Sequence, residues 1–297
     1  MMENVNINGA SLAYMERGRG EPVILVHGSA SDYRTWQDQQ DELAGGYRVI
    51  NYSRRYHWPN QKIQEGADYS MEEHADDLKA VMEETGAAPA HLVGHSYGAF
   101  LCLLFAIEHP DLVRTLVLGE PPTYTLYVSS TPKLPEILNL LVRKPRTAFA
   151  IMNFGIKGMA PARELAKRGN AIGAMRLFGE TILGPQFFSQ LSKRRLEQVD
   201  ANATRAEFLG SGFPPLQTAR VRELQIPTLL ITGKHSHPLF HRLADGLEGL
   251  LPRVERIQFE NASHIMHEDE AESFNRAVVS FLKRHSELTG SSHSSSG

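Results

Sequence analysis

The sequence predicts an α/β fold: a doubly wound, mostly parallel sheet of about eight strands, with helices on both faces and an inserted helical lid. Three observations predict it. Short apolar runs such as Pro22–Val26 and Thr228–Gly233 are typical of strands buried on both faces. Segments with helical spacing separate these runs, and this alternation indicates a parallel sheet. Between residues 123 and 218 the alternation stops, because helical patterning continues there without a buried-strand run.

The first part of the chain alternates strands and helices. Asn8-Gly9 lies between two loosely alternating runs, which predicts an opening hairpin. Ser70 and Glu73 have the spacing of a helix-capping pair, and Pro110 marks the end of a later helix. The predicted elements, in order, are a hairpin at 3–17, a strand at 22–26, a helix at 33–44, a strand at 47–52, a helix at 70–85, a strand at 91–93, a helix from 97 to about 109 and a strand at 115–118.

The alternation resumes after the helical insertion. The predicted elements there are a strand at 228–233, a helix near 238–250, a strand near 254–259 and a final helix through 282. We therefore expect an α/β core formed by residues 1–122 and 219–286, with residues 123–218 as the lid. Residues 287–297 are too polar to pack, so we expect a disordered tail.

Bulk composition narrows the possible functions. A formal net charge of −3 gives no reason to expect a nucleic acid or an anionic membrane as a partner. The single cysteine, Cys102, lies in an apolar run and cannot form an internal disulfide, which favours a reducing compartment. No apolar segment of about 18 residues occurs, and the start of the chain lacks a signal-peptide pattern. We therefore expect a cytoplasmic protein, and the oligomeric state stays open.

The stretch around Ser96 has the pattern of a strand that turns sharply into a helix. A short apolar run leads into Gly94-His95-Ser96-Tyr97-Gly98, and a long apolar run follows. The serine backbone is strained at such a turn, and side chains two residues away would crowd it, so glycine is needed on both sides. The backbone N–H of Tyr97 points the same way as the serine hydroxyl, at the start of a helix whose dipole favours negative charge.

Three motifs together carry a resemblance to a known family. They are His27-Gly28 after a predicted strand, the pentapeptide from Gly94 to Gly98, and Ala262-Ser263-His264 before the last helix. On these motifs the chain resembles the α/β-hydrolase superfamily. The resemblance covers roughly residues 5–122 and 222–284, and it implies a triad in the chain order serine, acid, histidine.

The resemblance assigns roles to particular residues. Ser96 would be the nucleophile and His264 the general base, while the backbone N–H groups of Ser29 and Tyr97 would form the oxyanion hole. A serine hydroxyl is a weak nucleophile, so a neutral imidazole must remove its proton during attack. A carboxylate behind that imidazole fixes its tautomer and stabilises the imidazolium. His267 is the weaker candidate for the base.

The acid departs from the commonest pattern of the family. Many members carry an aspartate just beyond the strand that follows the lid, where this chain has Ser236, which cannot hold the charge. Some members place the acid at the end of the strand before the lid, where Glu120 stands. Both strand ends lie at the carboxyl edge of the sheet, beside the nucleophile. We therefore predict Glu120 as the triad acid.

The choice of serine at position 96 also selects among the chemistries of the family. Epoxide hydrolases and haloalkane dehalogenases of this fold attack with a carboxylate, whereas Ser96 favours an acyl-enzyme. The predicted function is hydrolysis of carboxylic esters, with small or medium apolar esters or lactones as substrates. His27, His95 and Trp58 are the predicted substrate contacts, and the loop at 53–59 either lines the pocket mouth or is solvated. This mechanism needs no metal and no organic cofactor, so we expect neither.

Two alternatives stay open. The same triad could hydrolyse carbon–carbon bonds, or catalyse perhydrolysis or haloperoxidation without a cofactor. In a different class of function, the chain could be a small-molecule receptor with incidental turnover. An intact serine, base and acid argue against a purely binding role, because a binding protein does not need them. Fold alone does not decide between these functions.

Overall fold

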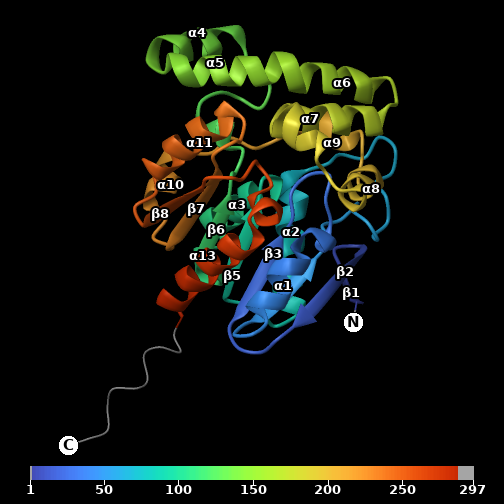
Figure 1. Cartoon of the computed structure of the whole chain (residues 1–297), viewed down its shortest axis with the longest axis vertical. Helices are drawn as coiled ribbons and strands as arrows, with labels where there is room; N and C mark the ends of the chain where they lie inside the picture. Colours follow the sequence, from blue (N-terminus) through green and yellow to red (C-terminus); the bar gives the residue numbers. More distant parts are fainter. Residues whose placement is uncertain (1, 287–297) are drawn as a thin grey trace, which may run out of the picture.

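The protein contains one eight-stranded sheet that is mostly parallel, as the sequence predicts (Figure 1). A computed structural model describes residues 2–286, so the predicted disordered tail at 287–297 lies outside the described residues. The pairs β1–β2 and β2–β4 are antiparallel, and the other neighbours are parallel. In spatial order the strands are β1 (Met2–Ile7), β2 (Ala10–Arg17), β4 (Arg48–Tyr52), β3 (Pro22–Val26), β5 (Ala90–His95), β6 (Val113–Gly119), β7 (Thr228–Gly233) and β8 (Val254–Phe259).

Alternating side chains of the central strands divide the core into two layers. Leu92 of β5 points into the cluster on one face of the sheet, and Val93 points into the cluster on the other. Leu116 and Val117 of β6 divide in the same way. Burial on both faces explains why these strands appear in the sequence as continuous apolar runs.

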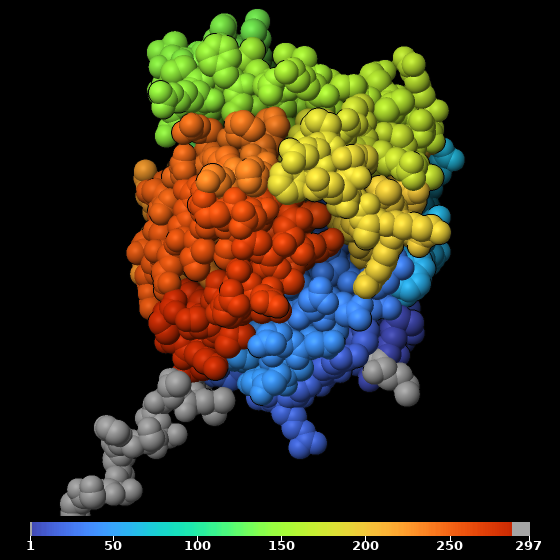
Figure 2. All heavy atoms as spheres, in the orientation of Figure 1, coloured from blue at the N-terminus to red at the C-terminus, as the bar shows by residue number. Residues whose placement is uncertain are grey.

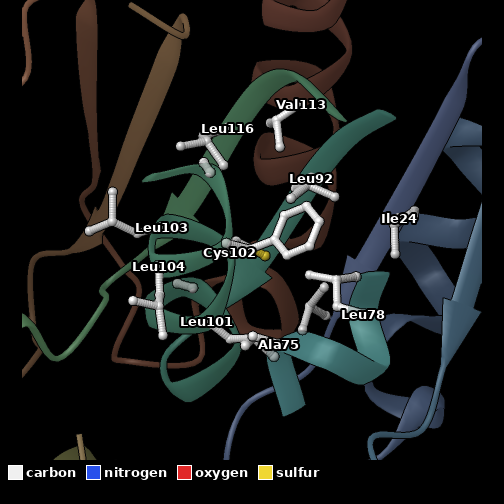
Figure 3. Close-up of a cluster of buried hydrophobic side chains, with 14 of the residues drawn as sticks. Ile24, Ala75, Leu78, Leu92, Leu101, Cys102, Leu103, Leu104, Val113 and Leu116 are labelled. Atoms are coloured by element: carbon white, nitrogen blue, oxygen red, sulfur yellow. The ribbon is translucent and has the colours of Figure 1, made fainter. Parts of the chain in front are cut away.

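Helices cover both faces of the sheet. Helices α2 and α3 pack in the cluster that contains Leu92, whereas α1 and α13 pack in the cluster that contains Val93. Figure 3 shows Cys102 of α3 surrounded by apolar side chains of the first cluster, and its burial raises the pKa of the thiol. The helices outside the insertion are η1 (Tyr33–Trp36), α1 (Gln37–Leu43), α2 (Met71–Glu84), α3 (Tyr97–Glu108), η2 (Pro110–Leu112), α11 (Pro238–Glu248), α12 (Met266–Asp269) and α13 (Ala271–Arg284).

Local signals in the sequence account for several boundaries. Ser70 caps α2 as predicted, because its hydroxyl accepts the N–H of Glu73 at 3.3 Å. The helix expected at 33–44 is instead a 3₁₀ turn followed by the short α1. The carboxylate of Asp32 accepts the N–H of Arg34 at 3.0 Å and so caps the tighter turn before α1 begins.

The chain between β6 and β7 is helical. It begins after Pro121 and Pro122, and Figures 1 and 2 show its part from 134 to 189 covering one end of the molecule. The rings of these two prolines, which directly follow Glu120, fix the φ angles of both residues and so stiffen this junction. The helices are η3 (Thr123–Leu126), α4 (Leu134–Arg143), α5 (Pro145–Phe154), the π-helix η4 (Gly155–Met159), α6 (Ala160–Lys167), α7 (Ala171–Ser189), α8 (Lys193–Ala201), α9 (Ala206–Leu209) and α10 (Thr218–Glu223). Within residues 2–286, no helix combines the length and apolar character needed to cross a bilayer.

Candidate active site

Ser96 stands at the sharp turn between β5 and α3. Its backbone has a φ of +50° and a ψ of −116°, which is a strained conformation for a residue with a side chain. The turn is held because the Ser96 N–H donates to the carbonyl of Gly119 at the end of β6, at 2.8 Å. The strain therefore persists within a well-packed strand–helix unit, as the sequence pattern predicts.

The glycines around Ser96 are required by close packing. A Cβ atom at Gly94 would lie 2.6 Å from the carbonyl oxygen of Gly98. One at Gly98 would overlap the carbonyl oxygens of Val26 and His27 at the end of β3. Because these neighbours are backbone atoms, they cannot move aside without displacing β3 or α3.

His264 and Glu120 form a direct contact although they are 144 residues apart. His264 Nδ1 lies 2.5 Å from Glu120 Oε2, and both side chains are buried. The other carboxylate oxygen, Oε1, accepts the N–H of Gly233 at 2.9 Å. The carboxylate thus holds the imidazole by Nδ1, and His264 Nε2 is a buried atom without a protein partner among the described residues. That nitrogen remains available to exchange a proton with another group.

His95 supports the loop that carries His264. Burial lowers the pKa of His95 well below its ordinary value, so its ring is neutral at pH 7. Its Nε2 donates to the carbonyl of His264 at 2.8 Å, which fixes the backbone of that residue. His95 also lines the smaller of two cavities beside Ser96.

Two cavities meet at Ser96. The smaller one, of about 60 Å³, is bordered by His264, Leu183 and other apolar residues of the helical segment. The larger one, of about 350 Å³, is bordered by Tyr97 and Glu207 and by mostly apolar side chains, but not by His264. Ser29 lines both cavities. A wider surface groove of about 680 Å³ lies elsewhere, between residues 62–68 and 201–210.

The predicted oxyanion donors lie on either side of the nucleophile. Tyr97 is the first residue of α3, so its backbone N–H has no acceptor within that helix. Ser29 follows Gly28, whose added Cβ would lie 3.2 Å from Ser96 Cβ. The loop after β3 therefore runs directly against Ser96, and the structure brings Ser29, Ser96 and Tyr97 together.

A family comparison assigns this fold. The family model described as the alpha/beta hydrolase fold matches residues 21–271. The chain belongs to the α/β-hydrolase family.

Individual α/β-hydrolases resemble the chain at low identity. The uncharacterized hydrolase YraK of Bacillus subtilis is 32% identical over 117 residues, which cover 39% of this chain and 43% of that protein, less than half its length. Epoxide hydrolase 3 of Xenopus tropicalis is 25% identical over 93% of this chain and 76% of that protein. Among solved structures, a thermophilic esterase from Thermogutta terrifontis has a TM-score of 0.66 and 22% identity, over 96% of this chain and 100% of that one.

Two predicted substrate contacts are corrected by their positions. His27 is fully buried behind the loop: its Nδ1 pairs with the carbonyl of Gly28 at 2.8 Å, and its Nε2 accepts the N–H of Arg54 at 2.9 Å. Both ring nitrogens are therefore used by the backbone. Trp58 is 39% exposed and packs against Tyr33 and Arg34, and it borders neither cavity.

Sequence reasoning missed two buried groups near the site. Arg54 lies in the loop expected to be solvated or at the pocket mouth, yet its side chain is fully buried. Glu207 comes from α9 and lines the larger cavity, and burial raises the pKa of its carboxyl. The two members of this charged pair lie in distant segments and leave no local pattern in the sequence, so their proximity is visible only in the folded structure.

Within residues 2–286, no cluster of three or more His, Cys, Asp or Glu side chains is arranged to hold a metal ion.

The packing at Gly98 can be tested by adding one methyl group. We expect Gly98→Ala to lower the free energy of unfolding by more than about 2 kcal/mol, because the new Cβ would overlap two carbonyl oxygens. Chemical denaturation measures this change. Gly46→Ala is the matched control, since a Cβ there meets no atom within 4 Å and should change stability by less than about 0.5 kcal/mol. Equal stabilities of the two variants would contradict the packing argument.

The Glu120–His264 contact predicts a large kinetic effect. Glu120→Gln keeps the shape of the side chain and an oxygen for the N–H of Gly233, but it removes the charge that holds the imidazole. We expect kcat to fall by about 10⁴-fold, with the melting temperature nearly unchanged. Glu260→Gln, at an exposed glutamate in the loop before His264, should keep wild-type kcat. An active Glu120→Gln enzyme would contradict the role of this contact.

Proposed function

We propose that the protein is a serine hydrolase that cleaves carboxylic esters, including lactones, through an acyl-enzyme. One observation carries the proposal: Ser96, on its strained turn, borders the same cavity as His264, whose imidazole is held by Glu120 at 2.5 Å. This arrangement supplies a nucleophile, a base and an orienting carboxylate at a mostly apolar cavity. The helical segment at 123–218 acts as the lid, because it supplies most of the cavity walls.

In the first half of the reaction, Ser96 Oγ attacks the ester carbonyl carbon. His264 Nε2 takes the hydroxyl proton, while Glu120 stabilises the resulting imidazolium through Nδ1. The carbonyl oxygen becomes an oxyanion and accepts hydrogen bonds from the backbone N–H groups of Ser29 and Tyr97. The carbonyl re-forms as the bond to the alcohol oxygen breaks, and His264 gives its proton to that oxygen.

In the second half, water replaces the alcohol. His264 takes a proton from the water as its oxygen attacks the acyl carbon, and a second oxyanion forms in the same place. When this intermediate collapses, the bond to Ser96 Oγ breaks and the proton returns from His264 to the serine. The products are the carboxylic acid and free enzyme, and the imidazole is neutral again.

The nucleophile separates this proposal from epoxide hydrolysis. The match to Epoxide hydrolase 3 of Xenopus tropicalis covers 93% of this chain. The family resemblance implies, however, that epoxide hydrolases of this fold attack with a carboxylate. A serine hydroxyl at that position forms an ester with a carbonyl substrate, which water can hydrolyse at the acyl carbon. The hydroxyl of Ser96 therefore favours acyl transfer over epoxide opening.

The two cavities support an orientation for the substrate. The leaving oxygen must lie near His264 because it receives a proton from that ring. Of the two cavities, only the small one is bordered by His264, and its volume of about 60 Å³ is much less than the 350 Å³ of the other. The alcohol portion is therefore small, and the acyl chain occupies the cavity of about 350 Å³.

Covalent labelling tests the reaction class. We expect turnover of p-nitrophenyl butyrate that is abolished by an alkyl phosphonate, with the phosphonyl group found on the peptide that contains Ser96 by mass spectrometry. Ser96→Ala should be neither labelled nor active, because it lacks the attacking oxygen. Labelling at another serine, or unchanged turnover by the Ser96→Ala variant, would overturn the proposal.

Two isomeric esters test the orientation of the substrate. Methyl hexanoate and pentyl acetate have the same formula, but they place the long chain on opposite sides of the carboxyl group. We expect kcat/KM to be at least about tenfold higher for methyl hexanoate, because a pentyl group exceeds the small cavity. A preference for pentyl acetate would show that the alcohol occupies the larger cavity.

A matched pair of variants locates the origin of that preference. Leu183→Ala enlarges the small cavity and should raise kcat/KM for pentyl acetate relative to methyl hexanoate. Leu239→Ala enlarges the larger cavity and should not raise that ratio. Since both esters are measured on the same variant, a loss of stability cancels from the ratio.

A further inference from the structure

Arg54 is a buried arginine directly beneath the loop that follows β3. Its side chain has no exposed surface. Its Nε donates to the carbonyl of His27 at 3.1 Å, and its Nη2 donates to the carbonyl of Gly28 at 3.0 Å. The planar guanidinium thus binds two consecutive carbonyls of the loop that carries Ser29.

The hydrogen bond from Arg54 Nη2 to the carbonyl of Gly28 fixes the direction of the Ser29 N–H. The carbonyl of Gly28 and the N–H of Ser29 belong to one peptide group, which is planar, and in a trans peptide the two bonds point in opposite directions. His27 Nδ1 also pairs with the Gly28 carbonyl, at 2.8 Å. Because two donors hold the oxygen on the buried side, the N–H is directed away from Arg54.

The side chain of Ser29 is held as well. It interacts with the carboxyl of Glu207 of α9 and opposes the rise in pKa that burial causes there, so the residue has a partner at its side chain as well as at the preceding peptide. Ser29 borders both cavities beside Ser96. The orientation of the Ser29 N–H is therefore set by contacts from outside the loop as well as by the loop itself.

We propose that Arg54 is a positioning residue for the oxyanion hole, which fixes and polarises the Gly28–Ser29 peptide so that its N–H binds the oxyanion formed during attack by Ser96. The inference rests on the proposed function. A cation at the carbonyl oxygen draws electron density through the peptide and makes its N–H a stronger donor, since linked hydrogen bonds polarise one another. The benefit is largest when the substrate oxygen carries a full negative charge.

The surroundings of Arg54 keep its charge in place. The hydroxyl of Tyr69 accepts from Nη1 at 2.8 Å, the ring of Tyr97 lies 4.2 Å from Cζ, and Glu207 Oε1 lies 4.0 Å from Nη2. A buried ion of this kind adds little net stability compared with apolar packing. Its place beneath a candidate catalytic peptide therefore fits a role in the reaction better than a role in folding alone.

Two ketones separate transition-state binding from ordinary binding. 1,1,1-Trifluoro-2-octanone forms a hemiketal with an active serine and places an oxyanion in the hole, whereas 2-octanone has nearly the same shape and stays a ketone. The ratio of their inhibition constants therefore reports on the oxyanion hole. We expect Arg54→Met to lower this ratio by at least about tenfold and kcat by about 10- to 100-fold, less than the 10²–10³ lost with a donor itself, while KM changes little.

Arg55→Met is the matched control. Arg55 is the neighbouring buried arginine, but it pairs with Asp77 and Glu73 and not with the loop that carries Ser29. Both variants should lose stability, yet Arg55→Met should keep the wild-type ratio of inhibition constants. A wild-type ratio in folded Arg54→Met would overturn the proposal, as would an equal loss in Arg55→Met.

A second variant covers the case in which Arg54→Met does not fold. Arg54→Lys keeps the charge but cannot donate to two carbonyls from one rigid plane, so we expect the ratio to fall by at least about threefold. An unchanged ratio in Arg54→Lys would then overturn the proposal. If wild-type enzyme shows no preference for the trifluoroketone, or no phosphonate label at Ser96, the failure lies with the proposed function and not with Arg54.

Discussion

The hydrogen bond between Glu120 and His264 connects three neighbouring strands of the sheet. Glu120 follows β6, its Oε1 accepts the N–H of Gly233 at the end of β7, and its Oε2 reaches His264 in the loop after β8. Because these strands are parallel, their carboxyl ends meet at one edge, and one carboxylate can contact all three. His264 is placed by the sheet topology and not by its own loop alone.

The same edge of the sheet holds Ser96. The N–H of Ser96 donates to Gly119, the residue directly before Glu120. The strained turn at Ser96 and the carboxylate that contacts His264 are therefore joined through adjacent residues of β6. A shift of this strand end would move both groups together, so their relative geometry depends on the packing of β5 against β6.

Much of this architecture could be predicted from the sequence because its signals are local. The apolar strand runs, the glycines around Ser96 and the motif before His264 each lie within a few residues. Glu120 is the predicted acid because Ser236 cannot carry the charge at the commoner position. The position of His27 could not be predicted, because its ring nitrogens are used by the backbone of its own loop and of the loop at Arg54. The cavity walls depend on how the helical segment folds over the sheet, which helical periodicity does not determine.

The two prolines after Glu120 have a mechanical consequence. Pro121 and Pro122 separate the carboxylate from the first turn of the helical segment, and each has a fixed φ angle. These two fixed φ angles reduce the torsional freedom between the carboxylate and the helical segment. A rearrangement of the helical walls would therefore disturb the carboxylate that contacts His264 less than it disturbs the cavities themselves.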